Sequence, residues 1–491
     1  MNNNCGDDMK KMYSDLILNK DIIDNDFIDC SDFLIRQVVS CGYKCFYCLF
    51  DGLVDFLQVN QLVTTPMLSC KDNFENPQKF YNALKDKILK SVEIKEVDNF
   101  EDCYTYLSSG FILIFVDGCS KAIAIGVQGW TKRNTDEPTN ESVVKGAKEC
   151  FVETLNDNRA LLRKRLKTHN LKFKQLKLGT AAKTIVAITY IDNRVNKKFL
   201  QRIEKELKSE KFNTVLDFGC LNPVVDTNIK TFFSTVITTE RPDVLVSKLL
   251  EGRIGIIVDG TPFVMYTPGL FSDAFSSLDD YNYPTFYSSF IRILRYLSFF
   301  ISLFLPGIYV AVGTFHQELI PTNLLFVVAT SEATTPLRLM TEAVLIHILY
   351  EIMREAGLRL PKAIGHAVSI IGAIVIGDAT VSAGIIGAPM LVIVAITAIS
   401  SYVVYPMFES VAVLRIIFIL IGGLTGIYGI MLGVAMLFVN VCTLNPYGVA
   451  YTSPFSPLTK KSLADTLYRQ SWLKLSKRKV RVFDLEGSTL E

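Results

Sequence analysis

The segment GRIGIIVDG at residues 252–260 repeats the pattern of GFILIFVDG at residues 110–118. The two segments agree at the first glycine, at three apolar positions and at the closing Asp-Gly pair. Each is an apolar run, rich in isoleucine and valine, that ends in a turn dipeptide. This pattern predicts a buried strand followed by a tight turn.

Two further segments extend the repeat. CFYCLFDG at residues 45–52 and IVAITYIDN at residues 185–193 each end in Asp before a helical stretch. Asp51 and Asp192 are 141 residues apart, and Asp117 and Asp259 are 142 residues apart. Two nearly equal offsets predict an internal duplication that produces two related α/β subdomains. Nothing near Asp117 or Asp259 provides a base, a metal ligand or a phosphate loop, so we expect no enzyme and no cofactor.

Composition divides the chain into unlike halves. The net charge of +2 over 491 residues, without a basic stripe, argues against a nucleic-acid partner. The polar start MNNNC lacks the regions of a signal peptide, so we expect the first 290 residues to fold in the cytosol. Eleven cysteines, an odd number, fit a reducing compartment better than a disulfide framework.

Apolar segments long enough to cross a bilayer begin near residue 293. Candidates are residues 293–313, 360–376 and 383–405, and residues 411–440 form one long tilted helix or two short ones. Residues 319–329 are too short to span and suggest a re-entrant or interfacial segment. The basic residues between Lys460 and Arg481 place the tail in the cytoplasm, and two cytoplasmic ends favour four spans.

Residues 342–359 have an amphipathic helical pattern, with Glu351, Arg354, Glu355 and Arg359 on the polar face. This helix lies on the membrane or packs on its neighbours, or it lines a vestibule.

The next segment, residues 361–380, contains ionisable groups at membrane depth, where they usually face a bundle interior or water. Several copies of this helix around an axis would form an ion pathway with a hydrophobic gate. The alternative is that its aspartate only marks the helix end. The candidate pore and gate residues are His366, Val368, Ser369, Ile371, Val375 and Asp378.

The stretch between the two subdomains predicts a connecting helix, in which Phe151, Leu155 and Leu162 are helix-spaced. Trp130, Arg163 and Arg165 are candidates for an assembly surface that contacts a partner subunit. The simpler interpretation is a solvated basic face.

Cys41, Cys45 and Cys48 have the C-x3-C-x2-C spacing by which radical SAM enzymes hold an iron–sulfur cluster. Here the segment is predicted to be a strand, and alternation would place Cys45 and Cys48 on opposite faces. We therefore expect no cluster.

The predicted fold is two related α/β subdomains, an internal duplication, followed by a transmembrane helical bundle. The predicted divisions are a polar leader (1–25), a first cytosolic subdomain (26–140), a helical connector (141–180), a second cytosolic subdomain (181–290), a transmembrane domain (291–442) and a basic cytosolic tail (443–491).

Several of these segments resemble the A subunit of GerA-type spore germination receptors. They include EGRIGIIVDGTPFVMYTPGLF (251–271), FHQELIPTNLL (315–325) and EIMREAGLRLPKAIGHAVSIIGAIVIGDATVSAGII (351–386). The resemblance runs from about residue 14 to Pro457. A close paralogue that accompanies the spore dipicolinate channel shares much of the pattern. The chain departs from it in the cysteine-rich strand and in Thr-Thr-Pro at residues 334–336, where Pro-Phe-Pro is usual.

The resemblance implies a receptor subunit in the inner membrane of an endospore. Its partners would be a transporter-like B subunit and a lipoprotein C subunit. It also implies a homo-oligomer with an ion-conducting pore that opens on nutrient sensing. The alternative is a membrane transporter with a cytosolic regulatory domain, which would need a substrate site at the bilayer midplane.

Overall fold

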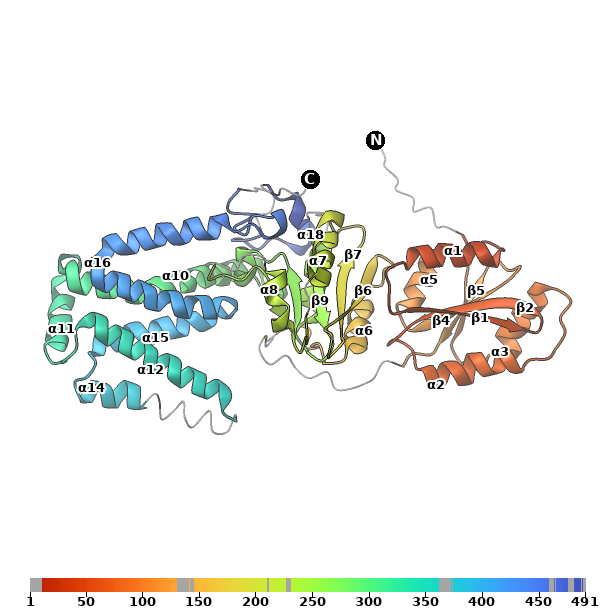
Figure 1. Ribbon diagram of the computed structural model, residues 1–491, viewed down its shortest axis with the longest axis horizontal. Helices are drawn as coiled ribbons and strands as arrows, with labels where there is room; N and C mark the ends of the chain where they lie inside the picture. Colours follow the sequence, from red (N-terminus) through yellow and green to blue (C-terminus); the bar gives the residue numbers. More distant parts are fainter. Residues whose placement is uncertain are drawn as a thin grey trace.

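The computed structural model describes residues 11–129, 141, 145–209, 212–226, 231–361, 372, 374–458, 463, 465–475, 481–486 and 488. The molecule is elongated (Figure 1), with a first sheet domain at one end, a second sheet domain in the middle and a helical region at the other end.

The first sheet domain contains a five-stranded antiparallel sheet with strand order β1-β2-β4-β5-β3. Its elements are α1 (Leu16–Asp26), β1 (Phe33–Ser40), β2 (Tyr43–Phe50), α2 (Phe56–Val59), η1 (Asn60–Thr64), α3 (Thr65–Ser69), α4 (Pro77–Ala83), η2 (Leu84–Ile88), β3 (Ile94–Val97), α5 (Phe100–Leu107), β4 (Phe111–Val116) and β5 (Ala122–Gly126).

The second sheet domain has the equivalent order, β6-β7-β9-β10-β8, and its strands are also antiparallel. Its elements are α6 (Leu155–Arg165), β6 (Leu171–Leu178), β7 (Thr184–Ile191), α7 (Lys197–Ser209), η3 (Phe218–Cys220), α8 (Asn222–Val225), β8 (Ile237–Thr239), α9 (Pro242–Leu250), β9 (Ile254–Val258), β10 (Val264–Thr267), η4 (Phe271–Phe275) and η5 (Leu278–Asn282).

The predicted duplication is confirmed strand by strand. Cys45 pairs with Val116 across β2 and β4, and Val186 pairs with Val258 across β7 and β9. These partners are related by the same two offsets that the sequence shows. The Asp-Gly pairs form turns, since Gly118 and Gly260 both have positive φ, 84° and 96°, at the β4–β5 and β9–β10 connections.

Each sheet carries helices on both faces, so each domain has three layers (Figure 1). In the first domain, α1 and α5 cover one face and α2 to α4 cover the other. Cys48 is buried with the first set of helices and Cys45 with the second. These two side chains therefore lie on opposite faces of β2, which confirms that they do not converge on a cluster. The Sγ atoms of Cys41 and Cys70 are paired as a disulfide.

The described part of the predicted helical connector, residues 141–180, contains one helix and one strand. Its helix is α6, which packs in the second sheet domain as α1 does in the first, and its last residues form the edge strand β6. The connector is thus the first part of the second repeat. The backbone N–H of Ser31 donates to Phe173 O at 3.1 Å, which joins the first domain to the outer edge of β6.

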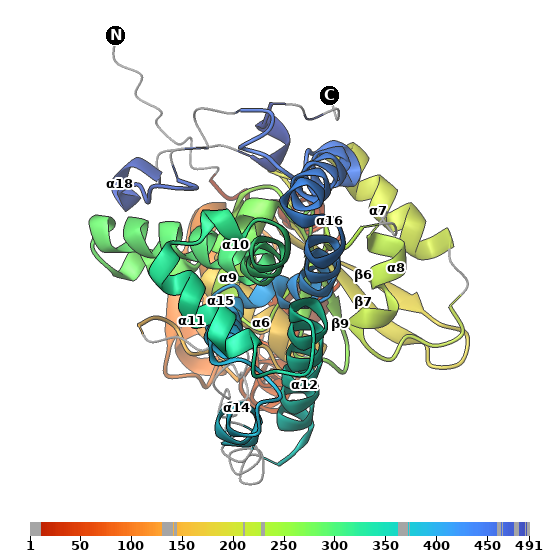
Figure 2. The same cartoon turned by 90° about the vertical axis from the view of Figure 1, so that its left-hand side faces the viewer.

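The helical region begins directly after η5. Its elements are α10 (Thr285–Phe315), η6 (Gln317–Leu319), α11 (Thr322–Glu332), α12 (Leu339–Arg359), η7 (Ile374–Ala379), α14 (Thr380–Ser382), α15 (Ala388–Val403), η8 (Tyr405–Met407) and α16 (Phe408–Thr443). Figure 2 shows these helices end on.

Two helices of the described chain are long and apolar enough to cross a membrane, Thr285–Phe315 and Tyr405–Thr443. The two helices are in close contact at Gly307 of the first and Gly422 of the second. A Cβ added to Gly422 would lie 2.4 Å from Gly307 O, so a larger residue would not fit there. Such small residues allow close helix packing. The α15 helix is apolar but has only 16 residues, and much of the predicted span 360–376 lies outside the described residues. The prediction of four spans therefore stays a prediction.

The long apolar run that ends the helical region is two helical legs. Gly426 has φ 70° and ψ −157°, a conformation that only glycine adopts readily. Beyond Gly426 the chain turns back, so that Gly433 lies beside Phe418. A Cβ added to Gly433 would be 2.9 Å from the Phe418 ring. In a straight helix these two residues would be about 22 Å apart. Figure 1 shows the two legs of α16 running side by side.

The described part of the predicted basic tail packs on the second sheet domain. It contains η9 (Pro446–Gly448), α18 (Trp472–Leu475) and η10 (Val482–Asp484). Tyr447 is 2% exposed, and its hydroxyl lies 2.8 Å from Val225 O and 2.9 Å from Glu206 Oε2. The chain after α16 is thereby tied to α7 and α8.

Candidate functional site

The predicted pore residues fall mostly outside the described residues. The structure does not describe His366, Val368, Ser369 or Ile371. Val375 lies in η7, but its side chain is outside the described part, and Asp378 in the same element is exposed. The pore and gate assignments therefore remain predictions.

The helix before this segment, α12, carries ionisable residues that face inward. Glu342 is fully buried, and His347 is 1% exposed. Glu342 Oε1 accepts a hydrogen bond of 2.6 Å from the N–H of Gly387, the residue that caps α15. Negative charge is favourable at a helix N-terminus, so this carboxylate orients α15 against α12.

A second polar centre lies between α12 and α16. Arg415 of α16 is 1% exposed and donates through Nε to Ser302 O of α10 at 2.9 Å. Its Nη1 lies 3.9 Å from Glu351 Oε1, and Glu351 Oε2 accepts a hydrogen bond of 2.8 Å from Arg354. The centre thus joins three helices around one carboxylate. A hollow of about 410 Å³ lies beside it, lined by Ile348, Glu351, Ile352, Arg354, Glu355 and Ile416.

Glu342, His347 and Arg415 are not among the residues that the sequence pattern singled out. The signal was present, because Arg415 stands alone in the apolar run VAVLRIIFIL, and charged residues within such runs are usually functional.

The second sheet domain meets α10 through a buried carboxylate. Asp280 accepts from Arg292 Nε at 2.8 Å and from Arg295 Nη2 at 2.9 Å. Arg292 is fully buried, and Asp280 is 3% exposed. Breaking a buried pair of this kind is costly, so the start of α10 is held rigidly to the domain.

The tail closes this junction from the other side. Asp465 accepts a hydrogen bond of 2.6 Å from the Tyr281 hydroxyl, and its Oδ1 lies 3.3 Å from Arg292 Nη1. Arg469 donates to Thr285 Oγ1 at 2.9 Å. A movement of the second sheet domain would therefore reach the first turns of α10 directly.

A further charge cluster lies in the second sheet domain beside this junction. Asp273 accepts hydrogen bonds from Arg253 and Lys248. Burial by itself would raise the pKa of Asp273, but Arg253 and Lys248 hold that pKa well below its ordinary value. The pKa of Arg253 is raised, because Asp273 and Glu251 outweigh its burial.

The predicted assembly residues do not share an exposed surface. Arg163 is fully buried between the sheet domains, where Nη2 donates to Asp32 Oδ1 at 2.9 Å and the guanidinium lies 3.7 Å from the Phe50 ring centroid. Arg163 therefore links the two sheet domains from the inside, because the buried carboxylate of Asp32 compensates its positive charge. Arg165 is partly exposed and pairs with Glu149 at 2.7 Å, and Trp130 lies outside the described residues.

The repeated aspartates also have a structural use. The N–H of Leu155, at the start of α6, donates to Asp259 Oδ1 at 3.0 Å, and Asn156 Nδ2 donates to Asp51 Oδ2 at 3.3 Å. One turn from each domain thus contacts the first residues of α6.

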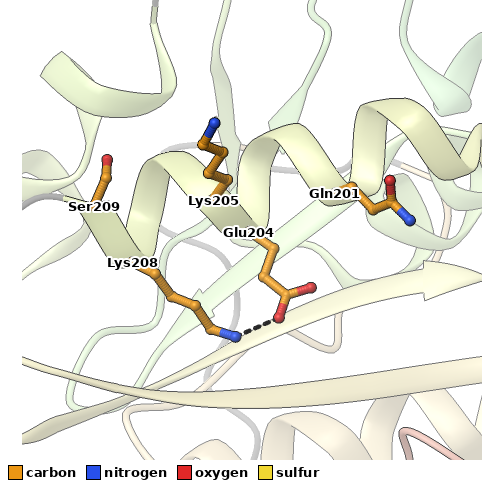
Figure 3. A pocket seen from close by; sticks show the side chains of 5 residues that line it. All are labelled: Gln201, Glu204, Lys205, Lys208 and Ser209. Carbon is orange, nitrogen blue, oxygen red and sulfur yellow. Dashed lines mark hydrogen bonds and ion pairs between the residues drawn. The ribbon is translucent and has the colours of Figure 1, made fainter.

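The surface of the second sheet domain offers one shallow hollow of about 400 Å³ along α7 (Figure 3). Glu204 pairs there with Lys208 at 2.5 Å and with Lys174 at 2.9 Å. Its carboxylate is already neutralised, so we assign no ligand to it. Among the described residues, no group of three or more His, Cys, Asp or Glu side chains is placed to hold a metal ion.

Comparisons with known proteins agree over most of the chain. Residues 21–481 match the family model described as Bacillus/Clostridium GerA spore germination protein. Spore germination protein KA of Bacillus subtilis is 38% identical over 429 residues, covering 87% of this chain and 78% of that protein. Uncharacterized membrane protein YfkQ of the same species is 36% identical over 455 residues, covering 91% and 88%.

A solved structure, the N-terminal domain of the A subunit of the Bacillus megaterium spore germinant receptor GerK3, shares 26% sequence identity with this chain at a TM-score of 0.41. The match covers 54% of this chain and 98% of that one.

Proposed function

The chain belongs to the GerA family of spore germination proteins, and we propose that it is the receptor subunit that converts nutrient sensing into ion release. In this proposal several copies assemble in the inner membrane of the spore, with both chain ends in the cytoplasm. The helices of these copies together form the ion-conducting pore. A transporter-like B subunit and a lipoprotein C subunit complete the receptor.

One observation supports the proposal most directly: charged side chains are buried among apolar helices. Glu342 and Arg415 are buried in a region that contains two candidate membrane helices, and the partly exposed Glu351 lies beside Arg415. Ionisable groups in such surroundings are costly, and they usually serve an ion pathway or a moving part. The segment that carries the predicted pore residues directly follows the helix that bears Glu342 and Glu351.

The contacts of the sheet domains with the helical region suggest how a signal would reach the membrane. They are tied to α10 through Asp280 and to the end of α16 through Tyr447. A signal that moves the second sheet domain would thus reach both candidate membrane helices. The proposed role is the transmission of a movement, and we propose no enzymatic reaction for the subunit.

The experiment compares nutrient-triggered release of monovalent cations from spores with the chain, without it and with it restored. Loss of release for one nutrient class and its recovery on restoration would support the receptor role. Unchanged responses to every nutrient tested would contradict it. Substrate accumulation by vesicles that contain only this chain would favour a transporter instead.

A further inference from the structure

One carboxylate in the helical region has two competing partners on two helices. Glu351 of α12 accepts a hydrogen bond of 2.8 Å from Arg354, three residues along the same helix. Its other oxygen lies 3.9 Å from Nη1 of Arg415 on α16, which is too far for a hydrogen bond. In this state the pair within α12 is formed, and the pair between α12 and α16 is not.

Hydrogen-bonding capacity is left unused around the carboxylate. Glu351 Oε1, Arg415 Nη2 and His347 Nε2 are buried and make no hydrogen bond within the described residues. Arg415 lies within electrostatic range of Glu351, Tyr350 and Arg354, and His347 lies within range of Arg415. Buried polar atoms without partners are costly, so a rearrangement that bonds them would recover free energy.

The side chains have room to rearrange. The open hollow beside Glu351 is lined by residues of α12 and by Ile416 of α16, the residue that follows Arg415. Glu351 has 21% of its side chain exposed, whereas Arg415 has 2%. The glutamate is thus the mobile member, and Arg415 is held by its bond to Ser302 O.

We propose that Glu351 exchanges between Arg354 and Arg415, and that this exchange sets how closely α12 approaches α16. When Glu351 bonds Arg354, the two helices are separated by the hollow. When it bonds Arg415, the hollow narrows and α12 is drawn to α16. The exchange would couple to the opening of the pore through α12 and α16, and in this last step the inference rests on the proposed function.

The test measures the approach of the two helices rather than germination. Ile352→Cys and Ile416→Cys place one thiol on each side of the hollow of the full-length chain in membrane vesicles. Cys220 and Cys442, the exposed free thiols of the described residues, are replaced by serine, and so is Cys5, which lies outside them. The rate of cross-linking by a short bis-maleimide then reports the separation of α12 and α16.

Two matched substitutions drive the exchange in opposite directions. Arg354→Met frees Glu351 for Arg415, and methionine still packs on the Phe408 ring that the guanidinium covers at 4.1 Å. The cross-linking rate should rise by about fivefold or more. Arg415→Met leaves Glu351 with Arg354, and the rate should fall by a similar factor. Arg359→Met is the control, because Arg359 is exposed, pairs with Glu355 and does not line the hollow, so the rate should stay unchanged.

A merely structural ion pair would respond differently. If Arg354→Met and Arg415→Met change the rate in the same direction, or if neither differs from the Arg359→Met control, the exchange is overturned. Arg415→Lys keeps the positive charge but lacks the guanidinium group, so it should lower the cross-linking rate less than Arg415→Met does. This variant keeps the test decisive if the Arg415→Met chain fails to fold. The two methionine variants could shift the cross-linking rate in opposite directions while the unaltered chain supports no nutrient response in spores. That outcome would contradict the proposed function and leave the exchange intact.

Discussion

Replacing Arg163 by methionine should loosen the contact between the two sheet domains by about 3–5 kcal/mol, because the change leaves the buried carboxylate of Asp32 without its partner. The guanidinium also lies 3.7 Å from the Phe50 ring centroid and 5.0 Å from that of Phe173, so its loss removes contacts with both domains. Arg165→Met is the matched control. Arg165 lies on the same helix but is partly exposed and pairs with Glu149, so it should cost at most about 1 kcal/mol.

The double variant separates the charge from the packing. Asp32→Leu combined with Arg163→Met removes both charges and keeps apolar volume, so most of the lost stability should return. Amide hydrogen exchange of the full-length chain in detergent measures the effect, because it gives the opening free energy of single segments. Amides of β6 should exchange about two to four orders of magnitude faster in the single variant. Equal exchange in the Arg163 and Arg165 variants, or a double variant no better than the single one, would refute the reasoning.

Three other outcomes follow from the structure. Asp280→Asn should weaken the ion pair with Arg292 and so reduce nutrient-triggered ion release. The amount of chain in the membrane, measured by immunoblots of spore membranes, should fall less than the ion release does. Gly426→Ala should cost roughly 1–3 kcal/mol, because alanine rarely adopts φ 70° and ψ −157°, and less chain should survive mild protease treatment. Asp273 has a lowered pKa in the folded chain, so its contribution to stability is present above pH 3.8 and is lost as the pH falls below that value; Asp273→Asn should abolish this part of the acid dependence in thermal melts.

The fold of the sheet domains was predictable where the pattern is local. The repeated apolar runs before Asp-Gly are central strands, and their spacing alone revealed the duplication. The edge strand β6 was missed because its sequence, LKFKQLKL, places lysines between its apolar residues and resembles a solvated segment. An edge strand has only one neighbour, so a mixed composition is tolerated there.

The internal links were not predictable from one sequence. Arg163 and Asp32 are 131 residues apart, and no local pattern pairs them. The charge of Arg163 suggested an exposed surface, but the fold brings a carboxylate to it in the interior. Tyr447 is a similar case, since the basic composition of the tail concealed a residue that packs in the core of the second sheet domain.

Buried charges in the helical region were only partly foreseen. The sequence drew attention to His366 and Asp378, whereas the structure shows Arg415 and Glu342 deep among the helices. Hydropathy averages concealed both, because Arg415 is a single charge in a long apolar run and Glu342 begins an amphipathic helix. A single charge in an apolar helix is costly unless it is paired, so its partner indicates where the functional site lies.

The measurement that tests the pore proposal most directly is potassium release from dormant spores that carry Val368→Ala, with no nutrient added. Val368 is one of the residues of the predicted hydrophobic gate, and a smaller side chain eases wetting of a constriction. The proposal predicts spontaneous potassium release at a rate well above that of unaltered spores. Tight dormancy with a normal nutrient response in this variant, and likewise in Ile371→Ala and Val375→Ala, would contradict it and move the ion pathway away from residues 361–380.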